Sequence, residues 1–203
     1  MTLFLASNAS KTLDLLLPLL PKSPHELKLA FIPTARDPYK ETPWIDVDRQ
    51  KVSELGFTII DVDLKDKTEN EIRKLLADVD IIFVAGGNTF YLLEKVKKSG
   101  FDKVVKELIQ KGIIYIGSSA GSVIMGPDIE SVKVFDDMHV AKLDSFEGLN
   151  LVDFVVLPHY KKGVYEKEHN QAMEEYKGKY KFILLTDEQA VLVTDSGYKV
   201  VES

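Results

Sequence analysis

Short apolar runs rich in β-branched and aromatic residues recur along the first half of the chain, with amphipathic segments between them. Runs such as 81–84 and 113–116 do not alternate between apolar and polar residues, which is typical of strands buried on both faces. The sequence therefore predicts a mainly parallel sheet. Its predicted strands cover residues 2–6, 27–33, 57–64, 80–85 and 112–117.

Helical periodicity fills the segments between these strands. The spacing of apolar residues predicts helices over 46–55 and 69–76, and two helical stretches within 89–110 that are separated at Ser99 and Gly100. Residues 13–20 form one apolar face of a further helix. Strand alternating with helix is the pattern of a doubly wound sheet covered on both faces.

The pattern changes after Ser122. Residues 126–150 are polar, irregular and acidic, and they predict a long loop or hairpin excursion over the edge of the sheet. A strand is expected over 151–158 and a charged helix over 164–176. Short strands at 182–186, 190–194 and 198–201, antiparallel in our interpretation, complete the pattern. No linker interrupts it, so residues 1–203 are expected to form one domain.

Composition narrows the class of protein. The chain has 203 residues, 45% hydrophobic and 29% charged, which is the balance of a globular protein. Its net charge of −6 disfavours a nucleic-acid partner. The apolar stretch 13–20 is too short to span a bilayer and does not resemble a signal peptide, so we expect no membrane partner and a cytoplasmic location. With no cysteine, the chain has neither a thiolate metal site nor a cysteine nucleophile.

The strongest local signal is the G-x-S-x-G pattern of Gly117, Ser119 and Gly121, directly after the strand 112–117. In a nucleophile elbow, a sharp turn from strand to helix projects the serine from the carboxyl edge of the sheet. The alternative is a small-residue turn that only lets a helix pack closely on a strand. Because the pattern follows a buried strand, and the Ala120 N–H is expected at a helix N-terminus, we favour a catalytic Ser119.

A second glycine-rich turn, Gly86 and Gly87, follows the strand 80–85. It either only caps the next helix through Asn88 or Thr89, or it directs a backbone N–H into the crevice of the sheet. An acyl-transfer intermediate needs two converging donors, so we predict an oxyanion hole made by the N–H groups of Gly87 and Ala120.

A catalytic serine needs a base. His159 follows the predicted strand 151–158 and is our first choice, because it too stands at a carboxyl edge. His139 and His169 remain alternatives, with His169 expected on a solvated helix face, and His25 is expected at the surface. The acid that orients the base is sought among the carboxylates between residues 126 and 144, which the pattern alone does not rank.

Several short segments together resemble peptidase family S51, the family of dipeptidase E, the α-aspartyl dipeptidases and cyanophycinase. The segments that carry the likeness are 3–8, 31–33, 85–90, 115–121, 137–138 and 158–160. The resemblance implies a flavodoxin-like three-layer α/β/α sandwich, similar to the class I glutamine amidotransferase domain, with serine in place of that enzyme's cysteine. It also implies a mostly parallel sheet and a serine peptidase that requires neither a metal nor an organic cofactor.

Carried over by position, the resemblance makes Ser119 the nucleophile, His159 the base and Asp137 the acid. Asp136 and Glu130 are alternatives for the acid, because the interval after Ser119 is longer than in the aspartyl dipeptidases. Gly87 and Ala120 again form the oxyanion hole.

The expected substrate is a short peptide. Well-known family members cleave α-aspartyl dipeptides or aspartate-containing polymers, but the segment 161–169 lacks the arginine expected after the catalytic histidine. Lys161, Lys162 and Asn88 are our substrate-binding candidates, and aspartyl specificity does not carry over directly, because lysine lacks the bidentate geometry of arginine.

Two other functions are compatible with parts of the pattern. An α/β-hydrolase esterase shares the G-x-S-x-G turn, although the interval from Asp137 to His159 is too compact for that fold. A non-catalytic flavodoxin-like module that binds a nucleotide or a peptide is the other alternative, although neither glycine turn matches G-x-G-x-x-G or a P-loop. The sequence carries no signal for an oligomeric state.

Overall fold

The central layer is a seven-stranded sheet in the order β3-β2-β4-β5-β1-β8-β9, in a computed structural model that describes residues 1–203. The first five strands in this order are parallel, whereas β8 runs antiparallel to β1 and β9 antiparallel to β8. The strands are β1 (Thr2–Ala6), β2 (Lys28–Ile32), β3 (Thr58–Asp61), β4 (Ile81–Val84), β5 (Ile114–Ser118), β8 (Gln189–Thr194) and β9 (Gly197–Glu202).

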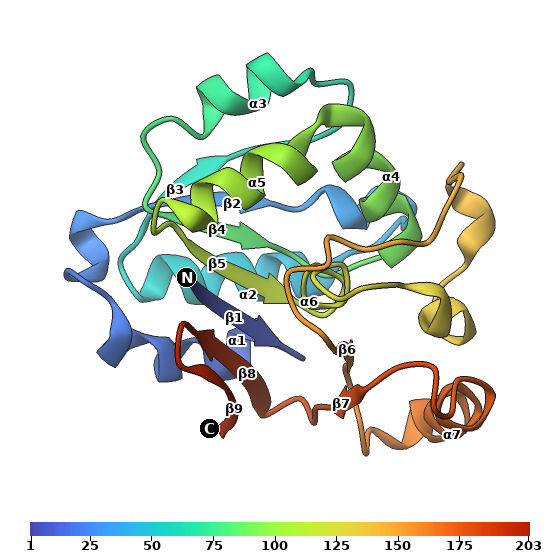
Figure 1. Ribbon diagram of the computed structural model, residues 1–203. Coiled ribbons are helices and arrows are strands. Elements are labelled where there is room, and N and C mark those ends of the chain that lie inside the picture. Colours follow the sequence, from blue (N-terminus) through green and yellow to red (C-terminus); the bar gives the residue numbers. More distant parts are fainter.

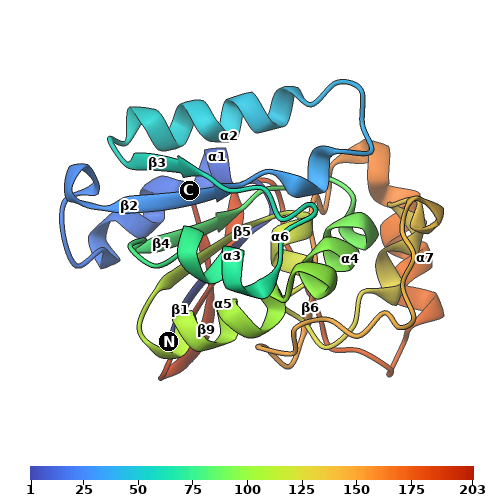
Figure 2. The same ribbon diagram turned by 90° about the horizontal axis from the view of Figure 1, so that it is seen from above.

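Helices cover both faces of this sheet (Figures 1 and 2). The short α1 (Ala9–Thr12) and the longer α2 (Pro43–Glu54) lie on one face. The other face carries α3 (Glu69–Leu75), α4 (Thr89–Ser99) and α5 (Phe101–Gln110), with α4 and α5 separated at Gly100 as the sequence predicts. The expected three-layer α/β/α fold with antiparallel strands at the C-terminal end is therefore confirmed.

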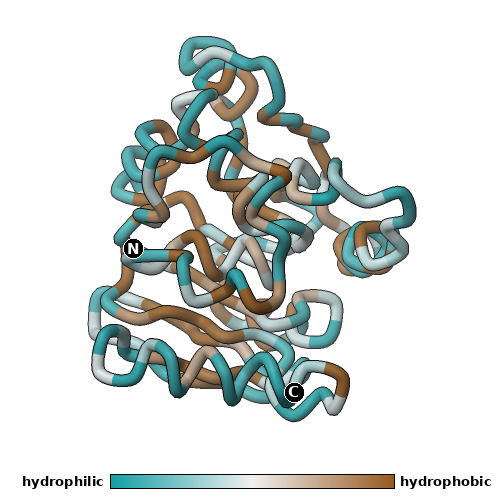
Figure 3. Tube along the Cα trace, turned by 90° about the vertical axis from the view of Figure 1, so that its right-hand side faces the viewer, coloured by the Kyte–Doolittle hydropathy of each residue, from teal (hydrophilic) through white to brown (hydrophobic).

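Successive side chains of the strands point to opposite faces of the sheet and belong to two separate hydrophobic cores. In β1, Leu3 and Leu5 belong to the core under α3, α4 and α5, whereas Phe4 and Ala6 belong to the core under α1 and α2. All four are fully buried. Figure 3 shows the apolar colour concentrated inside the molecule and the polar colour along the outer helices. This explains why the predicted strands lack polar alternation.

A second, two-stranded sheet corrects two expectations. β6 (Val155–Leu157) is shorter than the predicted strand 151–158 and pairs with β7 (Phe182–Leu184) instead of joining the main sheet. The pairing is parallel, so the prediction that 182–186 is antiparallel is wrong. The physical reason is the connection: α7 (Glu166–Glu175) carries the chain from β6 back to the start of β7, which makes a parallel βαβ unit.

The segment 126–150 is irregular, as predicted, with two short 3₁₀ helices (Glu130–Val134 and Met138–Val140) and one isolated bridge between Asp128 and Glu147. It lies beside α7 at the carboxyl end of the sheet (Figure 1). The apolar stretch 13–20 forms a 3₁₀ helix, Leu13–Leu19, that contains Pro18. None of the helices has the length and hydrophobicity that a membrane-spanning segment needs.

The G-x-S-x-G turn depends on close backbone packing. The short helix α6 (Ala120–Val123) begins directly after Ser119. A Cβ atom at Gly121 would lie 2.2 Å from the carbonyl oxygen of Val84, and one at Gly117 would lie 2.6 Å from the backbone of Gly121. Glycine at these two positions therefore lets α6 lie against β4 and β5.

We expect Gly121→Ala to lower the free energy of unfolding by about 1 to 3 kcal/mol, because the added methyl group collides with rigid backbone. Thermal unfolding would measure this as a fall in Tm of roughly 2 to 4 °C per kcal/mol. Gly163→Ala is the control, because a Cβ atom there meets nothing within 4 Å. An equal Tm for both variants would contradict this account of the turn.

Candidate active site

Ser119 occupies a strained turn between β5 and α6. Its φ of 49° and ψ of −110° are rare for a residue with a side chain. Two hydrogen bonds to the carbonyl oxygen of Ala6 hold this turn, one donated by the Ser119 N–H (3.0 Å) and one by the Ser122 hydroxyl (2.8 Å). The end of β1 thus fixes the serine at the carboxyl edge of the sheet.

His159 follows β6 and meets Ser119. Its Nε2 lies 3.0 Å from Ser119 Oγ. The backbone of His159 is also left-handed, with φ 61°, and its N–H donates to Ser7 Oγ at 2.7 Å. Ser7 is fully buried in the turn after β1, so the same turn braces both Ser119 and His159.

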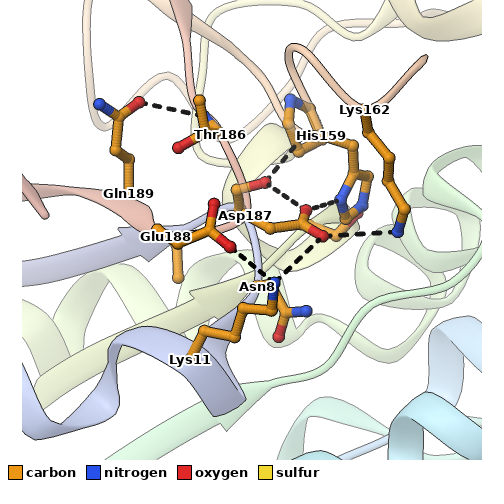
Figure 4. Close-up of polar contacts among 12 residues, drawn as sticks. Asn8, Lys11, His159, Lys162, Thr186, Asp187, Glu188 and Gln189 are labelled. Atoms are coloured by element: carbon orange, nitrogen blue, oxygen red, sulfur yellow. Dashed lines mark hydrogen bonds and ion pairs between the residues drawn. The ribbon is translucent and has the colours of Figure 1, made fainter. Parts of the chain in front are cut away.

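The carboxylate at His159 is Asp187, which follows β7. Its Oδ1 accepts from Nδ1 of His159 at 2.6 Å (Figure 4). With Nδ1 carrying the proton, Nε2 presents its lone pair to Ser119 Oγ. The hydrogen bond from His159 lowers the pKa of Asp187 to about 2, assisted by Lys162 at 3.4 Å and Lys11 at 4.0 Å from Oδ2.

The prediction of Asp137 as the acid does not agree with this geometry. Asp137 is exposed, and its Oδ1 accepts from the His139 N–H, which caps the turn Met138–Val140. The two alternatives are occupied elsewhere. Asp136 accepts from the Thr89 N–H at 2.8 Å, and burial raises the pKa of its carboxyl group, whereas Glu130 pairs with Lys179 at the surface.

The sequence analysis does not name Asp187, because it seeks the acid only between residues 126 and 144 and expects an antiparallel strand over 182–186. In the register of the parallel pair, Leu157 lies opposite Leu184, so the residues that follow the two strands meet at one edge. Functional residues of such folds gather at the carboxyl edge of parallel strands, which is why His159 is a candidate. A parallel strand over 182–186 makes Asp187 a candidate by the same rule.

Two backbone donors lie beside Ser119. The N–H groups of Gly87 and Ala120 donate to no acceptor in the protein. The turn that carries Gly87 approaches Ser119 closely, since a Cβ atom at Gly86 would lie 3.2 Å from the Cβ atom of Ser119. Gly87 has a φ of 146°, and a Cβ atom there would lie 2.3 Å from the carbonyl oxygen of Ala35, so only glycine fits.

Ser119 and His159 open into a cavity of about 470 Å³. Tyr39, Trp44 and Phe135 supply aromatic lining, and Phe135 comes from the irregular segment 126–150, which forms part of the wall. Besides His159, Tyr39 and Tyr165, the ionisable side chains in the lining are Glu41, Asp48, Asp136 and Lys162. Burial raises the pKa of Asp48 to about 6. Acidic groups thus outnumber the single lysine.

Only one of the three substrate-binding candidates lines the cavity, namely Lys162. Lys161 is exposed and lies over the ring of Tyr160. Asn88 is 2% exposed, and both ends of its amide are occupied, because Oδ1 accepts from the Tyr91 N–H and Nδ2 donates to the carbonyl oxygen of Asp137. Asn88 therefore caps α4 instead of facing a substrate.

The other histidines lie apart from Ser119. His25 and His139 are exposed. His169 is buried, so its expected place on a solvated face is wrong: its ring nitrogens lie 2.7 Å and 2.8 Å from the carbonyl oxygens of Tyr165 and Pro158. It packs α7 against the segment that carries His159.

Comparison with known proteins shows the family of this chain. The model of peptidase family S51 matches residues 3–201, nearly the whole chain. The chain belongs to peptidase family S51. Family membership makes it a serine-type peptidase, whose substrates are peptides.

Individual relatives agree with this membership. An uncharacterized peptidase of Pasteurella multocida is 34% identical, over 95% of this chain and 93% of its own. A probable alpha-aspartyl dipeptidase of Drosophila melanogaster is 36% identical, over 68% of this chain and 55% of its own. The crystal structure of a candidate peptidase E from Listeria monocytogenes superimposes with a TM-score of 0.93 at 30% identity, covering 100% of this chain and 98% of that one.

The depressed pKa of Asp187 predicts a pH-dependent contribution to stability. An aspartate titrates near 3.9 when unfolded, so the ionised Asp187 stabilises the fold above about pH 4, and this contribution is lost as the pH falls toward 2. We expect the stability difference between wild type and Asp187→Asn to shrink by about 1 to 2 kcal/mol over that interval.

Urea unfolding of both proteins between pH 6 and pH 2 measures this change. Asp144→Asn is the control, because Asp144 is exposed and makes no hydrogen bond or ion pair. A difference that stays constant over this range would contradict the ion pairing around Asp187.

Proposed function

We propose that this S51 peptidase hydrolyses short peptides with Ser119 as nucleophile, His159 as general base and Asp187 as the acid that orients the base. The observation that carries the proposal is the continuous hydrogen-bonded chain from Ser119 Oγ through the His159 ring to Asp187 Oδ1. The unpaired N–H groups of Gly87 and Ala120 beside it supply the oxyanion hole.

In the acylation step, Ser119 Oγ attacks the scissile carbonyl carbon while its proton passes to His159 Nε2. The carbonyl oxygen becomes an oxyanion and accepts hydrogen bonds from the N–H groups of Gly87 and Ala120. His159 then gives its proton to the leaving amine, the C–N bond breaks, and an acyl-enzyme remains on Ser119.

In the deacylation step, a water molecule gives a proton to His159 and attacks the acyl carbon. The second oxyanion collapses, the bond to Ser119 Oγ breaks, and the proton returns from His159 to the serine. Asp187 stays ionised throughout, in accord with its low pKa, and stabilises the imidazolium that forms in each step.

The substrate is a peptide small enough for a cavity of about 470 Å³. The name of the Drosophila relative makes N-terminal aspartyl dipeptides one candidate. The lining argues for a broader or different preference, because Lys162 is its one cationic side chain and already pairs with Asp187, while the exposed Glu41 would repel an acidic substrate group.

Turnover of Asp-X, Glu-X and neutral dipeptides and of a simple ester, by wild type and by Ser119→Ala, tests the proposal. We expect peptide cleavage by wild type and a loss of at least ~10⁴-fold in the variant, because removing such a serine costs about 10⁶ in subtilisin. Equal rates in both proteins would refute a catalytic Ser119.

The same panel separates the alternatives. Cleavage of neutral peptides alone would retain the mechanism and reject aspartyl specificity. Cleavage of the ester alone would favour an esterase, and thermal stabilisation by a peptide or a nucleotide without any turnover would favour a binding module.

The identity of the acid is tested by comparing Asp187→Asn with Asp137→Asn. We expect Asp187→Asn to lower kcat by about 10⁴-fold. The amide stabilises the wrong tautomer of His159, and it carries no charge that would stabilise the imidazolium. The loss in Asp137→Asn should be at least ~100-fold smaller, since that side chain is exposed and only caps a turn. The reverse order of the two losses in kcat would restore Asp137 as the acid.

A further inference from the structure

Trp44, the single tryptophan of the chain, makes one polar contact in the active-site cavity. Its indole Nε1–H donates to the carbonyl oxygen of Gly86 at 3.3 Å. Trp44 lies in the first turn of α2, and its ring packs edge to face against Tyr39, with the ring centroids 5.4 Å apart. The indole is therefore held from one side by an aromatic neighbour while its N–H holds the turn after β4.

The accepting carbonyl belongs to the same peptide unit as the proposed oxyanion donor. The Gly86 C=O and the Gly87 N–H are the two polar groups of one planar trans peptide, so they point in opposite directions. Holding the carbonyl toward Trp44 therefore fixes the direction of the Gly87 N–H. The hydrogen bond from Trp44 to the Gly86 carbonyl oxygen thus determines where the Gly87 N–H points.

This peptide unit needs such a restraint. Both of its residues are glycine, so a flip of the plane, which changes ψ of Gly86 and φ of Gly87, meets little steric resistance. Backbone hydrogen bonds anchor the chain only before and after it, from the Ala85 N–H to Ile32 and from the Asn88 N–H to Ala35. Between these anchors, the one hydrogen bond to the Gly86–Gly87 peptide comes from Trp44.

We propose that Trp44 is a positioning residue, whose indole N–H holds the Gly86–Gly87 peptide in the orientation that presents the Gly87 N–H to the substrate oxyanion. The inference rests on the proposed function, since it assigns a partner to one donor of that oxyanion hole. It predicts that the loss of the indole N–H weakens the stabilisation of the transition state more than the binding of the substrate.

Trp44→Phe tests the proposal, because it keeps an aromatic ring beside Tyr39 and removes the N–H. We expect kcat to fall about 10-fold, below the 10²- to 10³-fold cost of losing an oxyanion donor completely, with KM changed less than ~3-fold. A peptide aldehyde, whose adduct with Ser119 carries the oxyanion, should lose affinity by the same factor as kcat/KM.

Two controls separate positioning from general damage. Tyr198→Phe also removes one polar hydrogen from a partly exposed ring, but on β9 outside the cavity, and it should leave kcat unchanged. The pH profile of kcat/KM should have the same shape in Trp44→Phe and wild type, because the substitution leaves the contacts of His159 with Ser119 and Asp187 in place. Replacement of the indole by benzothiophene, with sulfur in place of N–H, should reproduce the Trp44→Phe result.

The outcomes distinguish this inference from the proposed function. If turnover depends on Ser119 but Trp44→Phe retains both kcat and aldehyde affinity, the positioning role is refuted and the peptidase mechanism stands. A rise in KM without a fall in kcat would also refute it, since Trp44 would then only contact the substrate. If wild type shows no turnover that depends on Ser119, both proposals fail.

Discussion

The turn after β1 is the constraint on which the active site depends. The carbonyl oxygen of Ala6 accepts hydrogen bonds from Ser119 and Ser122, and the hydroxyl of Ser7 accepts one from the N–H of His159. Ser119 and His159 both have positive φ angles, a strain that costs of order 1 to 3 kcal/mol at each residue. Because both hydrogen-bond to adjacent residues of one buried strand end, neither can relax without losing a buried hydrogen bond.

This turn also joins segments that belong to two different sheets. Ser119 and the glycine turn belong to the main sheet, whereas His159 and Asp187 follow the separate pair β6 and β7. Within that pair, α7 supplies the parallel connection, and its buried His169 lies between the carbonyl oxygens of Tyr165 and Pro158. The relative position of Ser119 and His159 therefore depends on how the βαβ unit packs against the end of β1.

The same division explains what the sequence could predict. Buried, mainly apolar strands of four or five residues and the glycines around Ser119 leave strong local patterns, so the sheet and the Ser119–His159 pair can be predicted from the sequence. β6 and β7 have three residues each, too few to show periodicity, and their parallel pairing depends on contacts between segments about 27 residues apart. Without that pairing, nothing local distinguished Asp187 from the other acids, or the buried His169 from a solvated helix face.

Two lysines near Asp187 connect the His159–Asp187 hydrogen bond to the charge of the cavity. Lys162 and Lys11 lie within 4.0 Å of Oδ2 and favour the ionised carboxylate that orients His159. Lys11 also pairs with Glu188 at 2.7 Å, as Figure 4 shows, which leaves Lys162 as the cation that faces the cavity. An acidic substrate group would have to draw Lys162 from Asp187. In this geometry, an acidic group that binds Lys162 competes with its ion pair to Asp187, whereas a neutral group leaves that ion pair and the His159–Asp187 hydrogen bond in place.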